Sequence, residues 1–316
     1  MKLFEHVPAR LLASQKREES WLIEGLWSER AVGIVGGEPK CCKSLLALDM
    51  AVSVASGRAC LRRFGVREKG PVLLYAAEDP LHVVRARLEG IALAAGADFE
   101  SLDVHVITAA RLRLDLHEHT ERLLATVDEL RPKLLVLDPF VRLHRIDENV
   151  AAEVAPLLER LRTLERRFQL AVVLVHHSRK SAASARGGQA LRGSSELHAW
   201  GDSNLYLRRK GEQLLLRAEH RAAASHDADL FLELRDEDGS LALHIADEPS
   251  PMPTRTPSPE ERVLDVLRET PGPMSTRLIR ERCRMRTASV VEVLECLVEK
   301  QRVRRLADGY TLIENV

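Results

Sequence analysis

The strongest constraint on the fold is an alternation of two hydrophobic patterns between Ala31 and His177. Short apolar runs rich in β-branched residues alternate with longer segments in which apolar residues recur every three or four positions. This order is typical of an α/β fold, a mostly parallel sheet with helices on both faces. The expected strands are 31–35, 72–76, 104–107, 134–137 and 171–175, and the expected helices are 43–56, 81–95, 118–130 and 151–167.

After Arg192 the hydrophobic pattern changes to strict alternation, which is the period of a β-strand. We expect antiparallel strands that extend the first sheet, with Asp238-Gly239 as a hairpin turn before the last of them. These strands are predicted at 204–207, 213–218, 230–234 and 241–245.

A proline-rich segment at 247–259 predicts a stiff linker, because proline fits neither a helix interior nor a central strand. Beyond it the sequence predicts three short helices and a hairpin, the order of a winged helix-turn-helix. We therefore expect an α/β domain at 1–246, a linker at 247–259 and a winged-helix domain at 260–316.

The charge balance excludes a global attraction to nucleic acid, since Lys plus Arg and Asp plus Glu number 47 each. Any contact with nucleic acid must be local. The cysteines, Cys41, Cys42, Cys60, Cys283 and Cys296, are odd in number and lack C-x-x-C spacing, which favours a reducing compartment over a disulfide framework. The sequence shows no export signal and no membrane span, so we expect a cytoplasmic protein.

The octapeptide from Gly37 to Ser44 follows the first predicted strand and opens a helix, as a phosphate-binding loop does. In such a loop, backbone N–H groups surround the phosphates, a lysine reaches the β and γ phosphates, and a serine hydroxyl ligates Mg²⁺. Lys43 and Ser44 occupy those two positions. The expected ATP-binding residues are Gly37, Glu38, Pro39, Lys40, Cys41, Cys42, Lys43, Ser44 and Leu45.

One position departs from the G-x-x-x-x-G-K-S pattern, because Cys42 stands where the second glycine belongs. A side chain there is expected to crowd the place where backbone approaches phosphate. The alternative is a surface turn before a helix that merely contains lysine and serine.

Two further strands end in carboxylates. Asp138 follows the run 134–137, which is the Walker B arrangement and predicts a Mg²⁺ ligand. Glu78 and Asp79 follow the run 72–76. We expect Glu78 to orient or deprotonate the attacking water and Asp79 to cap the next helix, although capping by both remains an alternative.

The last parallel strand ends in His176-His177, and consecutive side chains leaving a strand face opposite ways. At most one of them should point at the nucleotide, where it could sense the γ-phosphate; a structural hydrogen bond is the alternative. The stretch 181–193 that follows is rich in Ser, Ala and Gly. It could present Arg192 to a neighbouring subunit's phosphates or to DNA, or simply form a solvated loop.

These motifs, in this order, resemble the RepA-type plasmid replicative helicases, a family of RecA-like ATPases. The resemblance extends over about 21–210 and includes the segments at 21–26, 77–80, 137–139, 176–180 and 192–195. It implies a RecA-like core, ATP and Mg²⁺ as ligands, and a homo-oligomeric ring, often hexameric, that acts on DNA. It assigns Lys43 and Ser44 to the Walker A pair, Glu78 to the catalytic glutamate, Asp138 to Walker B and His177 to the sensor.

Basic residues in the C-terminal region cluster near the third helix and on the hairpin, where a winged helix meets DNA. We expect DNA contacts at Arg284, Arg286 and Arg304. However, residues 259–316 contain eleven basic and ten acidic residues. The third helix also contains Glu292, Glu295 and Glu299, which would oppose a phosphate backbone, so protein binding or packing remains an alternative.

Two functions follow from this sequence. The first is an ATP-hydrolysing motor that acts on DNA, with helicase-like activity. The second is a weakly hydrolysing regulatory switch that binds DNA or a protein through its C-terminal domain. The intact set of Lys43, Ser44, Glu78 and Asp138 favours the first, and Cys42 favours the second.

Overall fold

A computed structural model describes residues 6–11, 20–177, 195–210, 213–221, 229–237, 240–246, 259–268, 270, 272–283, 287–306 and 308–313. The chain divides into two compact units, Met1–Glu248 and Pro249–Val316. The predicted turn at 238–239 and the segment 247–258 of the predicted linker lie outside the described residues.

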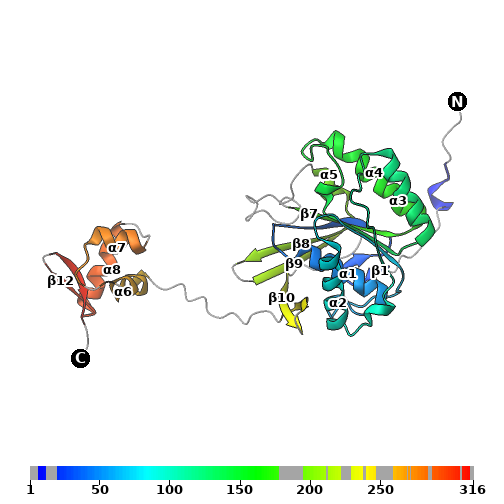
Figure 1. The fold of residues 1–316 in the computed structure, drawn as a ribbon. Helices are drawn as coiled ribbons and strands as arrows, with labels where there is room; N and C mark the ends of the chain where they lie inside the picture. The colour runs from blue at the N-terminus through cyan, green and yellow to red at the C-terminus, as the bar shows by residue number, and fades with distance from the viewer. Residues whose placement is uncertain are drawn as a thin grey trace. The chain divides into compact units, whose positions relative to one another are not determined.

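Among the described residues, a nine-stranded sheet forms the centre of the first unit (Figure 1). Its strand order is β11-β10-β9-β8-β3-β7-β6-β4-β5. The strands from β8 to β5 in this order run parallel, and β9, β10 and β11 pair antiparallel. The bounds are β3 (Val32–Gly37), β4 (Val72–Ala76), β5 (Val104–Val106), β6 (Leu134–Asp138), β7 (Ala171–His177), β8 (Ser203–Lys210), β9 (Gln213–His220), β10 (Leu230–Glu237) and β11 (Ser240–Ile245).

The direction of β8 differs from the prediction. Residues 204–207 were expected to form an antiparallel strand, but β8 runs parallel to β3 and is antiparallel only to β9. The chain between β7 and β8 includes helix α5 (Ser195–Trp200), and parallel strands require a crossover of this kind. Alternating hydrophobicity shows that a strand is present but does not determine its direction.

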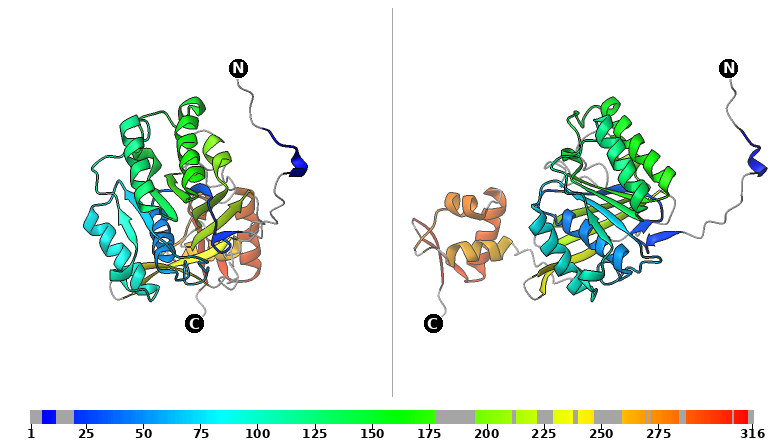
Figure 2. Two further views of the ribbon diagram at one scale, coloured as in Figure 1. Left: turned by 90° about the vertical axis from the view of Figure 1, so that its right-hand side faces the viewer. Right: turned by 45° about the vertical axis from the view of Figure 1, so that its right-hand side comes forward.

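Helices cover both faces of the sheet (Figure 2). Helices α1 (Lys43–Ser56) and α2 (Leu81–Ala94) lie on one face, and α3 (His117–Leu130), α4 (Ala151–Phe168) and α5 lie on the other. Because successive strand residues face opposite ways, Val173 joins the core beneath α1 while Val172 and Leu174 join the core beneath α4. Both faces are therefore buried, as the continuously apolar parallel strands require.

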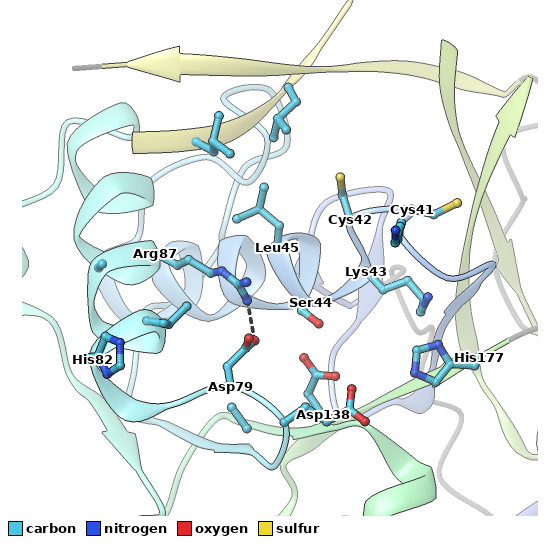
Figure 3. Close-up of a pocket in the computed structure, with 17 residues that line it drawn as sticks. Cys41, Cys42, Lys43, Ser44, Leu45, Asp79, His82, Arg87, Asp138 and His177 are labelled. Atoms are coloured by element: carbon cyan, nitrogen blue, oxygen red, sulfur yellow. Dashed lines mark hydrogen bonds and ion pairs between the residues drawn. The ribbon is translucent and has the colours of Figure 1, made fainter. Parts of the chain in front are cut away.

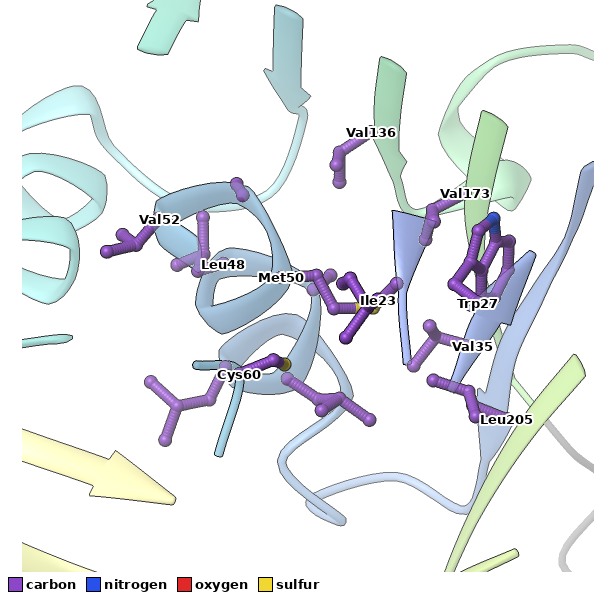
Figure 4. Packing of buried hydrophobic residues seen from close by; sticks show 14 of the residues in the cluster. Ile23, Trp27, Val35, Leu48, Met50, Val52, Cys60, Val136, Val173 and Leu205 are labelled. Atoms are coloured by element: carbon purple, nitrogen blue, oxygen red, sulfur yellow. The ribbon is translucent and has the colours of Figure 1, made fainter. Parts of the chain in front are cut away.

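Helix α1 is buried on nearly all sides, which its apolar sequence permits. Figure 4 shows Met50 pointing from α1 toward the strands that carry Val35 and Val173. On its other side, α1 contacts α2 and β11, and β11 also packs against α2. The antiparallel end of the sheet thus curls over to the α1 face and comes close to the start of that helix.

Shorter elements complete the first unit. The helical turn η1 (Ala9–Leu11) and the antiparallel pair β1 (Trp21–Ile23) and β2 (Trp27–Ser28) precede β3. The turns η2 (Phe99–Ser101) and η3 (Phe140–Arg142) follow α2 and β6. Trp27 is fully buried, so the segment before β3 is part of the core.

The second unit has three helices followed by a two-stranded hairpin. Its elements are α6 (Pro259–Arg268), α7 (Thr276–Cys283), α8 (Thr287–Glu299), β12 (Val303–Leu306) and β13 (Gly309–Leu312). It has a hydrophobic core of its own, which includes Val263, Ile279 and Leu294. In the part of the chain that is described, none of the helices is both long and apolar enough to cross a bilayer.

Candidate functional site

The C-terminal ends of β3, β7, β6 and β4 meet at one edge of the sheet. Gly37 of β3 is in register with His177 of β7, and Asp138 of β6 is in register with Ala76 of β4. Glu78 follows two residues after Ala76. Parallel α/β sheets bind ligands at this edge. A cavity of about 640 Å³ opens there, a volume within the range of about 300–1,000 Å³ that is usual for small-molecule sites (Figure 3). Its wall includes Lys43, Ser44, Glu78, Asp138 and His177.

The loop that joins β3 to α1 has the backbone of an anion-binding turn. Lys40 and Cys42 are left-handed, with φ of 64° and 60°. A Cβ added to Gly37 would lie 2.2 Å from the carbonyl oxygen of Leu207, so the close approach of β8 requires glycine there. A left-handed residue followed by helix turns successive N–H groups toward a common centre, and the α1 N-terminus adds its positive dipole. Residues 40–45 line the cavity.

Cys42 keeps a backbone conformation that favours glycine. It is the N-cap of α1, with φ of 60° and ψ of 25°, a left-handed conformation that costs a non-glycine residue about 1–2 kcal/mol. Its side chain packs against the core, and Figure 3 shows it pointing away from Lys43 and Ser44. The departure from glycine is therefore accommodated by strain in the backbone dihedrals of Cys42, and the expectation that its side chain crowds a bound phosphate stays a prediction.

Lys43 reaches back across the loop. Its Nζ donates a hydrogen bond to the carbonyl oxygen of Glu38 over 2.7 Å, and only 5% of the residue is exposed. Burial lowers the pKa of Lys43, and the nearby Asp138 and Glu78 charges oppose that shift. An ammonium group held at the centre of this loop is placed to exchange a weak carbonyl partner for a phosphate oxygen.

Asp138 is the most strongly perturbed carboxylate of the site. Burial raises its pKa to about 6, and the charges of Asp79 and Glu78 act in the same direction. A hydrogen bond from Ser44 and the charge of Lys43 oppose the shift. A buried carboxylate beside two others is an environment that favours a cation.

Glu78 and Asp79 are each paired with an arginine from a different element. The Nε of Arg142, in η3, donates to Oε1 of Glu78 over 2.9 Å. Arg87 of α2 pairs with Asp79 (Figure 3). The N-cap of α2 is Pro80 and has no side-chain cap, so the expectation that Asp79 caps this helix is wrong. Arg87, nearly two turns into that helix, provides a stronger partner for Asp79 than the backbone N–H groups.

The two histidines that end β7 face opposite ways. His177 lines the cavity, where Figure 3 shows its ring near Lys43. His176 is 1% exposed and lies 3.9 Å from the carboxylate of Glu148, with its ring against Phe140. His177 is therefore the histidine within reach of a ligand.

The cavity extends beyond the loop to residues that sequence patterns did not single out. Helix α2 contributes His82, Val83, Ala86 and Arg87, and β10 and β11 contribute Leu234 and Leu241. Both leucines are unusually exposed for their type, at 42% and 49%. An apolar wall next to a phosphate-binding loop has the character of a site for a flat organic group.

The residues fit Mg²⁺ and a nucleotide. Among the described residues, no three His, Cys, Asp or Glu side chains converge to enclose a metal. Mg²⁺ does not need such a cage, because one or two carboxylates and the substrate phosphates suffice. Asp138 and the hydroxyl of Ser44 are the two protein groups placed to hold it, and their shared hydrogen bond puts them in contact.

Three of the predicted site residues, Arg192, Arg284 and Arg286, lie outside the described residues. Arg304 is exposed on β12 of the second unit, and next to it Arg305 stacks on Tyr310 at 5.9 Å.

Comparison with known proteins agrees with this geometry. The chain resembles the crystal structure of a KaiC-like protein from the hyperthermophilic archaeon Pyrococcus horikoshii OT3, with a TM-score of 0.51 and 14% identity, over 71% of this chain and 93% of that chain. This similarity confirms the predicted RecA-like α/β fold. The AAA_25 family model, described as an AAA domain, matches residues 2–183, more than half of the 316 residues. The chain thus belongs to the AAA_25 family, with the fold and the loop of a nucleotide-binding ATPase domain.

Proposed function

We propose that this protein binds MgATP at the cavity and hydrolyses it. The observation that supports the proposal is the convergence of Lys43, Ser44, Glu78, Asp138 and His177 on one cavity at the loop. These residues end, or closely follow, four strands that are far apart in the sequence. A surface turn with a coincidental lysine and serine would not assemble them.

Each side chain has a separate task in hydrolysis. The Lys43 ammonium replaces its bond to the Glu38 carbonyl by one to a phosphate oxygen. The carboxylate of Asp138 and the hydroxyl of Ser44 would hold Mg²⁺, which would neutralise phosphate charge. The Glu78 carboxylate orients the attacking water and accepts its proton. His177 donates a hydrogen bond toward the terminal phosphate and distinguishes the nucleotide before and after hydrolysis.

The apolar wall takes the base of the nucleotide. Leu234 and Leu241 would cover one face of a purine, and burial of these exposed leucines favours binding through the hydrophobic effect. The His82 ring and the Arg87 guanidinium lie on the α2 wall of the same cavity. The selection of ATP over inorganic triphosphate therefore depends on this part of the cavity.

The wider role that we propose is an ATP-dependent action on DNA. It is supported by the resemblance to replicative helicases and by three exposed arginines of the second unit, which we take to be a winged helix. Arg304 and Arg305 lie on strand β12 of the hairpin, and Arg302 lies directly before it. Glu292, Glu295 and Glu299 are exposed on α8 and would repel a phosphate backbone. The hairpin rather than α8 is then the element that contacts DNA.

The alternative is a regulatory switch with slow turnover. The exposed acidic face of α8 favours it, because this face suits a basic protein surface better than DNA. The decisive experiment measures ATP turnover with and without single- and double-stranded DNA, and particle mass in the same samples. Stimulation by DNA in ring-sized particles supports the motor, and slow, DNA-independent turnover in smaller particles supports the switch.

A matched pair of variants tests the DNA contact. Arg304→Ala should weaken DNA binding. It should also reduce the slope of log affinity against log salt concentration by about one, the amount expected for one lost phosphate contact. Arg268→Ala removes an arginine that is also exposed but lies on α6, paired with Asp265, and should leave binding unchanged. Equal binding by both variants would reject the hairpin as a DNA contact.

A further inference from the structure

The carboxylate proposed to orient the attacking water is held by an arginine. Arg142 Nε donates to Glu78 Oε1 over 2.9 Å, across 64 positions of sequence. We infer that Arg142 is a positioning residue for hydrolysis, which fixes the Glu78 carboxylate on the cavity wall and thereby raises the rate of the chemical step. This inference rests on the proposed ATPase function.

The paired conformation of Glu78 faces the cavity. Glu78 lines the cavity, whereas Arg142 is not part of its wall. In this conformation the Glu78 charge is close enough to Lys43 and Asp138 to act on the pKa of each. The ion pair therefore does not withdraw the carboxylate from the site. It stabilises the conformer in which the carboxylate lies beside the two groups that would hold phosphate and Mg²⁺.

Glu78 needs such a partner because little else restrains it. It lies in the short connection between β4 and α2, and 43% of its side chain is exposed. A glutamate with this exposure has several side-chain rotamers of similar energy. Catalysis by an oriented base requires one of them, since displacement by about 1 Å can lower a rate about 100-fold.

Arg142 is attached to a rigid support. Its turn, η3, follows directly after Asp138 and Pro139. Phe140 of this turn is fully buried and packs against the rings of His144 and His176. The Arg142 N–H donates to the carbonyl oxygen of Pro139 over 3.1 Å. The guanidinium therefore ties Glu78 to the same strand end that carries the proposed Mg²⁺ ligand.

Steady-state kinetics of matched variants test the inference. Arg142→Ala should lower kcat about five-fold, which is what the loss of an exposed ion pair of ordinary strength allows. The KM for ATP, the affinity for ADP and the melting temperature should stay at the wild-type values. Arg142→Lys should restore part of kcat. Arg145→Ala is the control. Arg145 lies three residues after Arg142, is similarly exposed, pairs with a different carboxylate, Asp115, and does not line the cavity.

The same kinetics include a coupling test. In a Glu78→Gln background, Arg142→Ala should cause no further loss, since the group that it positions is gone. An unchanged or raised kcat in Arg142→Ala, or a full additional loss in the double variant, would overturn the inference.

The Lys43→Ala variant separates this inference from the proposed function. If Lys43→Ala still turns over ATP at the wild-type rate, the ATPase proposal fails and the positioning role fails with it. If turnover depends on Lys43 but is indifferent to Arg142, only the positioning role is rejected.

Discussion

Replacement of Asp138 by asparagine should stabilise the ligand-free protein at neutral pH. Asp138 is 8% exposed, and burial raises its pKa from 3.8 to about 6, with the charges of Asp79 and Glu78 acting in the same direction. An ionised carboxylate in this place costs stability, which a neutral amide of the same shape avoids. Under the proposed function, the carboxylate has a use that an amide lacks, because it would bind Mg²⁺.

The magnitude follows from the two pKa values. A rise from 3.8 to about 6 corresponds to about 3 kcal/mol at about 1.36 kcal/mol per unit. The folded state binds the proton more tightly than the unfolded state, so the penalty is absent below pH 3.8, grows as the pH rises, and is complete above about pH 6. Asparagine loses part of the hydrogen bond from Ser44, so we expect a gain of about 2 kcal/mol at pH 7.5, or about 4–8 °C in Tm.

Unfolding by urea without nucleotide or Mg²⁺ measures this gain. Wild type and Asp138→Asn are compared at pH 7.5 and pH 4.5, with Glu121→Gln as an exposed control on α3. At pH 4.5 the stabilisation by Asp138→Asn should nearly vanish, because wild-type Asp138 is then mostly protonated in the folded state, and the remaining penalty of about 1 kcal/mol is offset by the weakened hydrogen bond from Ser44. MgATP should raise the Tm of wild type but not that of Asp138→Asn. A variant no more stable than wild type at pH 7.5, or equally stabilised at both pH values, would refute the reasoning.

Three further variants test other parts of the site. Glu78→Gln should lower kcat by about 100-fold or more while nucleotide affinity is kept, measured by single-turnover hydrolysis and by titration; hydrolysis at the wild-type rate would remove Glu78 from the mechanism. Cys42→Gly should leave kcat within about two-fold of wild type, since the side chain points away from Lys43 and Ser44. Cys42→Val should lower Tm, because a β-branched residue tolerates a φ of 60° poorly. A large rise in kcat for Cys42→Gly would show that the cysteine limits turnover. Leu241→Asp should weaken ATP binding at least ten-fold but leave inorganic triphosphate binding unchanged, in competition titrations; an equal loss for both ligands would place the base elsewhere.

The sequence predicted the parallel core well because its signals are local. Each short apolar run predicts a strand, and each segment in which apolar residues recur every three or four positions predicts a helix. Strand β4 and helix α1 accordingly have the predicted bounds, 72–76 and 43–56. The edge that carries the site followed from the rule that parallel strands end on the same side. For this reason Asp138 and Glu78 could be expected near Lys43 without any coordinates.

The remaining features depend on contacts between residues far apart in the chain. The direction of β8 depends on the crossover before it, and the pairing of Arg142 with Glu78 joins positions 64 apart. Leu234 and Leu241 enter the cavity only because the antiparallel end of the sheet curls over α1 and α2. No local pattern contains this information. The role of Asp79 was wrongly assigned because a nearby arginine, Arg87, competes for it.

Equilibrium binding of a non-hydrolysable ATP analogue with Mg²⁺ tests the central claim most directly. Wild type should bind it in a Mg²⁺-dependent manner, and Lys43→Ala should bind at least 100-fold more weakly, as expected for loss of a charge-assisted contact to phosphate in a buried place. Equal affinity of the two proteins would contradict the claim that Lys43, Glu78 and Asp138 surround one bound nucleotide.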